Sequence, residues 1–156
     1  MAIIGFNYSK FDCERKVAQG SGSIDINHNV SIKNVEKTSL NVGGTKNEVL
    51  KIDFNFDVLY GNNLGKISIS GDVIYTDTKE IITEVFQAWG KDKKLNPIVN
   101  EQVFRFVYGK SIVKSLELAD SLNLPSPVPL PKINFTGQSA QNSQVNNAPV
   151  VSGKKK

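Results

Sequence analysis

The stretch of sequence that decides the fold is VLKIDFNFDVLYGNNLGKISISGDVIY, residues 49–75. In its first part every second residue over 50–60 is apolar or aromatic, and mostly charged or amide side chains stand between them. This period of two is typical of a strand with one buried face. The alternation resumes over residues 67–75 after a short turn at 61–65. Two such strands joined by a short turn predict an antiparallel hairpin.

Two further strands are predicted upstream of this hairpin. Residues 24–32 carry isoleucine or valine at most even positions, with polar residues between them, and two glycines at 43–44 can turn the chain afterwards. Residues 6–16 alternate less regularly, but their three aromatic side chains indicate one more strand. The sequence therefore predicts four antiparallel strands. Gly71, in the last of them, indicates a bulge or a close neighbour.

Downstream of the hairpin the apolar residues follow a helical period. A short helix is predicted over residues 78–89, ended by Gly90. Asn96 can cap a second helix that starts at Pro97, where the missing amide hydrogen does no harm. This helix is predicted over residues 97–122, which gives a length of about 39 Å. The predicted fold class is α+β, a four-stranded antiparallel sheet followed by a short and a long C-terminal helix.

The long helix carries more apolar residues than one sheet face can cover. Its bulky residues form two rows on different sides of the helix, and residues 106–108 are consecutive and all bulky. Such residues cannot all point into one core, so we expect some of them to contact a ligand, a bound polypeptide or a neighbouring subunit. The candidate residues for client binding or subunit contact are Phe104, Phe106, Val107, Tyr108 and Ile112.

The chain is predicted to be one domain over residues 1–135. This domain includes a proline-rich strap at residues 125–135. A proline stands at every second position from 125 to 131, which favours an extended segment on the surface. Residues 136–156 are rich in glutamine, asparagine and serine, and we expect them to form a disordered polar tail.

Residue types that carry out catalysis or bind metals are scarce. Cys13 is the only cysteine and His28 the only histidine, so an internal disulfide is excluded and a histidine–cysteine metal site would lack ligands. We expect His28 to be structural or exposed. Asp53 and Asp57 share a strand face about 13 Å apart, too far to act as a carboxylate pair. We therefore predict no enzymatic activity, no cofactor and no metal.

Charge and hydropathy restrict the partners. The chain has 19 basic and 15 acidic residues, and three of the lysines are residues 154–156 of the tail, which leaves 16 basic and 15 acidic residues in the rest. A nearly neutral body does not favour nucleic-acid binding. No run approaches the roughly 18 apolar residues of a membrane span, and no signal peptide is recognisable. With its lone thiol, the protein is predicted to be cytoplasmic.

The order of these elements, together with two groups of residues, resembles the SecB family of export chaperones, and most closely the SecB-like proteins outside the bacterial export group. The first group runs from LY at 59–60 through GKISISG at 65–71 to VIY at 73–75. The second is LNLP at 122–125 followed by PKINF at 131–135, which is similar to the segment after the long helix of SecB. The resemblance covers roughly residues 3–135 and contains no catalytic signature.

The resemblance implies an ATP-independent holdase, which keeps client chains unfolded in apolar grooves, and a homotetramer made from two dimers. It leaves open whether the clients are exported proteins, antitoxins or unfolded chains in general. Export SecB is markedly acidic and docks on the SecA motor partly through that charge. The nearly neutral body of this chain argues against SecA as a partner.

The residues leave a second function open. In this alternative the protein is an oligomeric interaction scaffold without chaperone activity, and subunit contacts consume the surplus apolar surface. Failure to bind an apolar dye in the native oligomer would favour the scaffold. The role of the lysine-ended tail stays open in both cases.

Overall fold

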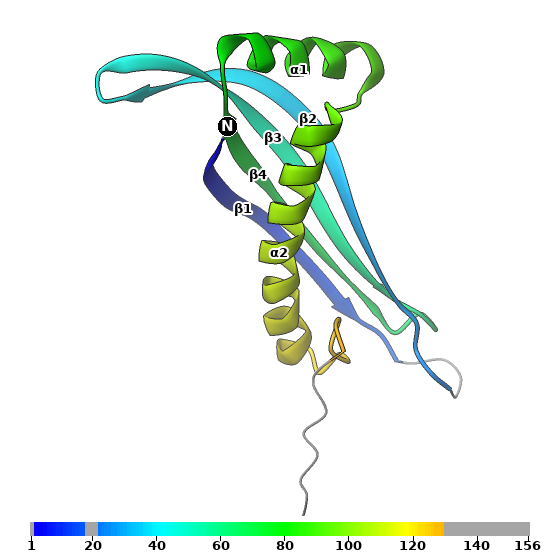
Figure 1. The fold of residues 1–156 in the computed structure, drawn as a ribbon. Coiled ribbons are helices and arrows are strands. Elements are labelled where there is room, and N and C mark those ends of the chain that lie inside the picture. Colours follow the sequence, from blue (N-terminus) through cyan, green and yellow to red (C-terminus); the bar gives the residue numbers. More distant parts are fainter. Residues whose placement is uncertain (1, 18–21, 130–156) are drawn as a thin grey trace, which may run out of the picture.

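The computed structural model describes residues 2–17 and 22–129, which fold into one sheet and two helices (Figure 1). The strands and helices are β1 (Ala2–Arg15), β2 (Ile26–Val42), β3 (Thr45–Tyr60), β4 (Gly65–Thr76), α1 (Lys79–Asp92) and α2 (Pro97–Ser121). All strand pairs are antiparallel, and the order across the sheet is β1-β4-β3-β2. The predicted fold class is therefore confirmed.

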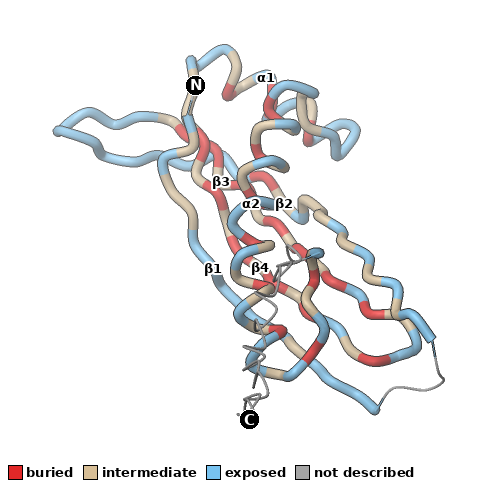
Figure 2. Tube along the Cα trace, turned by 60° about the horizontal axis from the view of Figure 1, so that its bottom comes forward, coloured by how far each residue is buried: buried red, intermediate tan, exposed pale blue. Residues whose placement is uncertain are grey.

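Both helices pack on the same apolar core, which the alternating residues of β3 and β4 build. The even-numbered residues of β3 from Leu50 to Tyr60 are all buried, and so are the large apolar side chains at odd positions of β4 (Figure 2). Lysine, aspartate, asparagine and serine occupy most of the intervening positions. One face of the sheet is thus covered and the other is polar, as the period of two predicts.

The irregular pattern of the outer strands comes from extra residues in their ladders. The register of β1 against β4 shifts twice, which leaves Ile4 and Ser9 as the extra residues. The register of β2 against β3 shifts once, at Lys33, so the buried residue that follows is the odd-numbered Val35. The strand predicted to end at residue 32 in fact continues to Val42, and the bulge is the reason that the even-numbered pattern stops there.

The predicted helix ends are correct for α2 and wrong for the end of α1. The Asn96 side chain accepts a hydrogen bond of 3.0 Å from the backbone N–H of Ile98, so it caps α2 as predicted. The first helix does not end at Gly90. It continues to Asp92, and Lys93 ends it in a left-handed conformation with φ 53°, where its N–H donates to the Trp89 carbonyl.

The face of α2 that packs on the sheet repeats every four residues, and its side chains become smaller toward the C-terminal end. Small side chains allow a helix to lie closer to a sheet. The stripe consists of Val99, Val103, Val107, Ser111, Ser115 and Ala119. Because serine is polar, Ser111 and Ser115 interrupt the apolar pattern of this stripe. For that reason it was not identified from the sequence as the face of α2 that packs on the sheet.

We expect Ser111→Ala to raise the free energy of unfolding by about 1 kcal/mol. Ser111 is fully buried and its hydroxyl has no hydrogen-bond partner among the described residues, so its removal ends a desolvation penalty. Ser115→Ala is the matched control, because the Ser115 hydroxyl donates to the Ile112 carbonyl at 2.7 Å. Urea unfolding of both variants checks this, and equal shifts for both would contradict it.

The chain after α2 turns back against the end of the sheet. Leu124 and Pro127 are buried, and residues 125–129, the described part of the predicted strap, have no regular secondary structure. Residues 130–135 of the predicted strap and the predicted tail at 136–156 lie outside the described residues. Neither helix is long and apolar enough to cross a membrane.

Candidate functional site

The buried stripe of α2 divides the helix into two flanks, each with bulky side chains. On one flank the Phe106 ring lies 5.6 Å from the ring of Phe6 in β1. On the other flank the Tyr108 ring lies 6.0 Å from the ring of His28 in β2. Because β1 and β2 are the two edges of the sheet, α2 presents one apolar row toward each edge.

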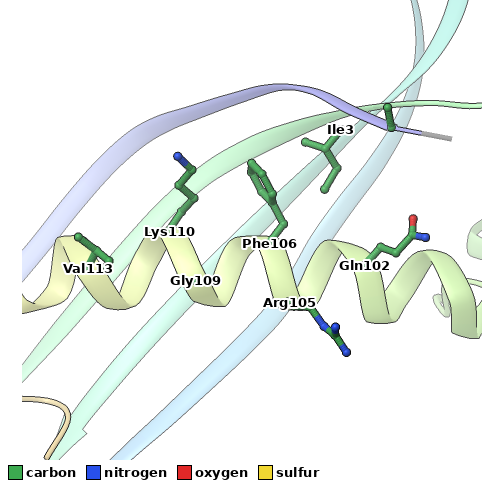
Figure 3. Close-up of a pocket in the computed structure, with 8 residues that line it drawn as sticks. Ile3, Gln102, Arg105, Phe106, Gly109, Lys110 and Val113 are labelled. Carbon is green, nitrogen blue, oxygen red and sulfur yellow. The ribbon is translucent and has the colours of Figure 1, made fainter.

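A groove of about 790 Å³ lies between the first flank and the start of β1. Figure 3 shows Phe106 and Ile3 reaching into this space from α2 and β1, while Arg105 points away. Its lining residues are Ala2, Ile3, Gln102, Arg105, Phe106, Gly109, Lys110 and Val113. We call this space the β1 groove. Val113, which is 65% exposed, and Phe106 form its apolar wall on the helix side.

Aromatic side chains extend the apolar surface along β1 beyond the groove. Phe6 stacks on Phe54 of the core with 5.4 Å between ring centroids, Tyr8 packs edge-on against Phe6, and Phe11 follows Tyr8 at 5.2 Å. Tyr8 and Phe11 are both exposed. The Lys114 ammonium lies 5.1 Å from the Phe11 ring, so cations border this row.

The opposite side of α2 carries three of the predicted residues, Phe104, Tyr108 and Ile112, which we call the β2 flank. Tyr108 is 40% exposed and meets the ring of Phe56 edge-on at 5.9 Å. His28 Nε2 lies 2.6 Å from the Pro127 carbonyl, which can only accept, so this nitrogen carries the proton. His28 Nδ1 then accepts from the Tyr108 hydroxyl at 3.4 Å. His28 is therefore structural, as predicted.

A second hydrogen bond, made by Tyr60, holds the segment after α2. We expect Tyr60→Phe to lower the free energy of unfolding at neutral pH by about 1 kcal/mol. The Tyr60 hydroxyl donates to the Pro125 carbonyl at 2.7 Å, and burial raises the pKa of Tyr60 to about 12. The folded chain therefore keeps this proton at pH values where the unfolded chain, with an ordinary pKa of about 10, loses it.

The stability that Tyr60 contributes is full below pH ~10 and is lost as the pH rises toward 12. The difference in unfolding free energy between the natural protein and Tyr60→Phe should accordingly shrink across this range and then reverse in sign, because a rise in pKa from about 10 to about 12 corresponds to about 3 kcal/mol. Urea unfolding of both proteins at several alkaline pH values measures it. Tyr75 also has a raised pKa, from burial and its bond to Asp77, but it is present in both proteins and cancels. A difference independent of pH would contradict the assignment.

The structure places the five predicted residues in three environments. Phe106 lines the β1 groove, while Phe104, Tyr108 and Ile112 belong to the β2 flank. Val107 is fully buried against the sheet, so its prediction as a client or subunit contact is wrong. The reason is geometric, because Val107 lies in the four-residue stripe that faces the sheet.

Of the three residues that form the apolar wall of the β1 groove, Phe106 was predicted from the sequence, but Ile3 and Val113 were not. Val113 shares an apolar row with the buried valines in sequence, but it points away from the sheet. Ile3 lies before the first bulge of β1, where alternation gives no reliable face. In the sequence, Val113 is visible only as one of many apolar residues of the helix, and Ile3 only as an apolar residue beside an irregular stretch.

The site has the chemistry of a binding surface. Among the described residues no three histidine, cysteine, aspartate or glutamate side chains cluster to hold a metal ion. Burial raises the pKa of Cys13, which keeps its thiol protonated and weakly nucleophilic. What the two flanks offer is exposed apolar area beside backbone edges.

No family model matches the chain, and no curated protein matches it. Among solved structures it is similar to a SecB-like chaperone of Mycobacterium tuberculosis in complex with a ChAD peptide from an antitoxin. The two chains are 12% identical, the match covers 85% of this chain and 90% of that one, and the TM-score is 0.48. The arrangement of four antiparallel strands followed by two helices is established by the structure of this chain itself, independently of that similarity.

Proposed function

We propose that the protein is a holdase-type chaperone that binds extended apolar segments of unfolded polypeptides without ATP. The observation that carries the proposal is the β1 groove, with its volume of about 790 Å³ and an apolar wall formed by Ile3, Phe106 and Val113. Exposed apolar surfaces of this kind mark interaction sites in soluble proteins.

The position of the groove beside a sheet edge supports an extended polypeptide as its occupant. Within the described chain β1 pairs only with β4, so its other side presents backbone N–H and C=O groups. An extended client can hydrogen-bond to such an edge as an added strand and place alternate side chains in the adjoining groove. Tyr8 and Phe11 extend the contact along the same strand.

The β2 flank is proposed as a second contact surface for a client or a neighbouring subunit. Phe104, Tyr108 and Ile112 are only partly covered by their own chain. Together with Phe106 they are the residues that we propose for client binding or subunit contact. The sequence resemblance to the SecB family supports the chaperone function and extends it to a homotetramer acting in the cytoplasm.

Light scattering tests the proposal directly. A chemically unfolded client is diluted into buffer with and without the purified protein, in the absence of ATP, and the mass of the protein alone is measured in parallel. We expect suppressed scattering at near-stoichiometric ratios and a soluble complex of oligomer and client. An oligomer that leaves the client to aggregate and binds no apolar dye would refute the holdase and favour the interaction scaffold.

A further inference from the structure

A second, smaller pocket lies at the corner where α1 ends and α2 begins, over the edge strand β2. It has a volume of about 360 Å³, at the low end of the range for small-molecule sites. Phe104 and Trp89 line it together with Ile32 and Leu95. We call it the corner pocket, and it shares no lining residue with the β1 groove.

The polar groups at the corner pocket favour an anion. Lys93 and Lys94 line it, and neither makes an ion pair with a described carboxylate. The Lys93 ammonium lies 5.5 Å from the centre of the Trp89 ring, so this cation is held against the aromatic wall. The amide side chain of Asn100 is a further lining group that can donate.

The start of α2 lines the same corner but offers no free N–H group there. Pro97, its first residue, lines the pocket and has no backbone N–H, and the N–H of Ile98 donates to the Asn96 side chain. The positive charge of the corner pocket therefore comes from its two lysines.

We propose that the corner pocket binds a small apolar molecule that carries a carboxylate. The aromatic and aliphatic walls suit the apolar body, and Lys93 and Lys94 suit the negative group. Apolar walls beside two lysines favour such a ligand over inorganic phosphate, which has no apolar part to bury. The corner pocket shares Phe104 with the β2 flank, but it needs neither the β1 groove nor an oligomer, so failure of this proposal and failure of the chaperone function are distinguishable.

The only tryptophan of the chain is a reporter inside this pocket. The probe is 3-phenylpropionate, titrated against the emission of Trp89, and its matched neutral control is 3-phenylpropionamide. We expect a saturable change in emission with the acid and at least tenfold weaker binding of the amide. Inorganic phosphate in place of the acid is expected to give no saturable change.

The variants distinguish binding in the corner pocket from a general effect of positive charge on the surface. Lys93→Gln with Lys94→Gln should weaken binding of the acid at least tenfold, while Lys91→Gln, an exposed lysine that does not line the pocket, should change it less than twofold. Lys94→Gln alone keeps the contact of Lys93 with Trp89 and serves if the double variant folds poorly. Absence of saturation, equal binding of the amide, or an equal loss in Lys91→Gln would overturn the proposal. Holdase activity is not needed for any of these readouts.

Discussion

Gly71→Ala is expected to lower the free energy of unfolding by more than about 3 kcal/mol, a large part of the roughly 5–15 kcal/mol that stabilises a typical domain. A Cβ atom at this position would lie 2.1 Å from the backbone oxygen of Asn7 and 2.9 Å from Cζ of Phe54. Asn7 belongs to the edge strand β1, and Phe54 is buried in the core, so one methyl group must displace a strand or a packed ring.

The cause is space and not backbone conformation, since Gly71 has no positive φ. Gly90→Ala is the matched control, because nothing lies within 4 Å of an added Cβ there and the residue is inside α1. That variant should gain about 0.5–1 kcal/mol from the higher helix propensity of alanine. Thermal or urea unfolding measures both variants. Similar stability for Gly71→Ala and the natural protein would show that β1 does not approach this glycine.

Gly71 also shows what a sequence pattern can foresee. A glycine inside a strand indicated a bulge or a close neighbour, and the structure has the close neighbour, with Phe54 packed over the glycine. The pattern could not say which side chain fills the space. Phe54 and Gly71 are cross-strand partners in the ladder, and this pairing follows from the register of the β3–β4 hairpin.

The strands that a regular period describes were predicted well, and those with bulges were not. Along β3 and β4 the period of two is unbroken from Leu50 to Tyr75 except at the turn, so both strands and their buried faces follow from it. An extra residue such as Lys33 reverses which parity is buried. Bulges depend on the partner strand, so a single run of residues carries no sign of where they occur.

The same limit applies to the candidate site. The surplus of apolar residues on α2 correctly indicated that some of them lie outside the core, but the direction of the buried stripe decided which ones. The buried stripe includes Ser111 and Ser115, whose small size matters more here than their polarity. Counting apolar residues therefore placed Val107 with the contacts and did not single out Val113, whereas in the structure Val107 is buried and Val113 is exposed.

Substitutions at neighbouring residues of α2 should consequently differ in their effect on client binding, although both lower the stability of the protein. The double change Phe106→Ser with Val113→Ser alters the apolar wall of the β1 groove, while Val107→Ala opens a cavity under the helix. Each should lower the free energy of unfolding by roughly 1–3 kcal/mol, the first through the loss of packing between Phe106 and Phe6 and the second through the cavity. The two variants are thus matched in stability.

They are not matched in client binding if the β1 groove holds the client. Burying one large aromatic side chain contributes about 1.5–3 kcal/mol, so the groove variant should bind an unfolded client about tenfold more weakly or worse. Val107→Ala should keep its affinity, because Val107 is out of reach of any bound polypeptide. The measurement is the protein concentration that halves client scattering, at a temperature where both variants stay folded. Equal loss in both variants would attribute the effect to stability alone, and full activity of the groove variant would move the binding surface to the β2 flank, where Phe104 and Tyr108 become the residues to change.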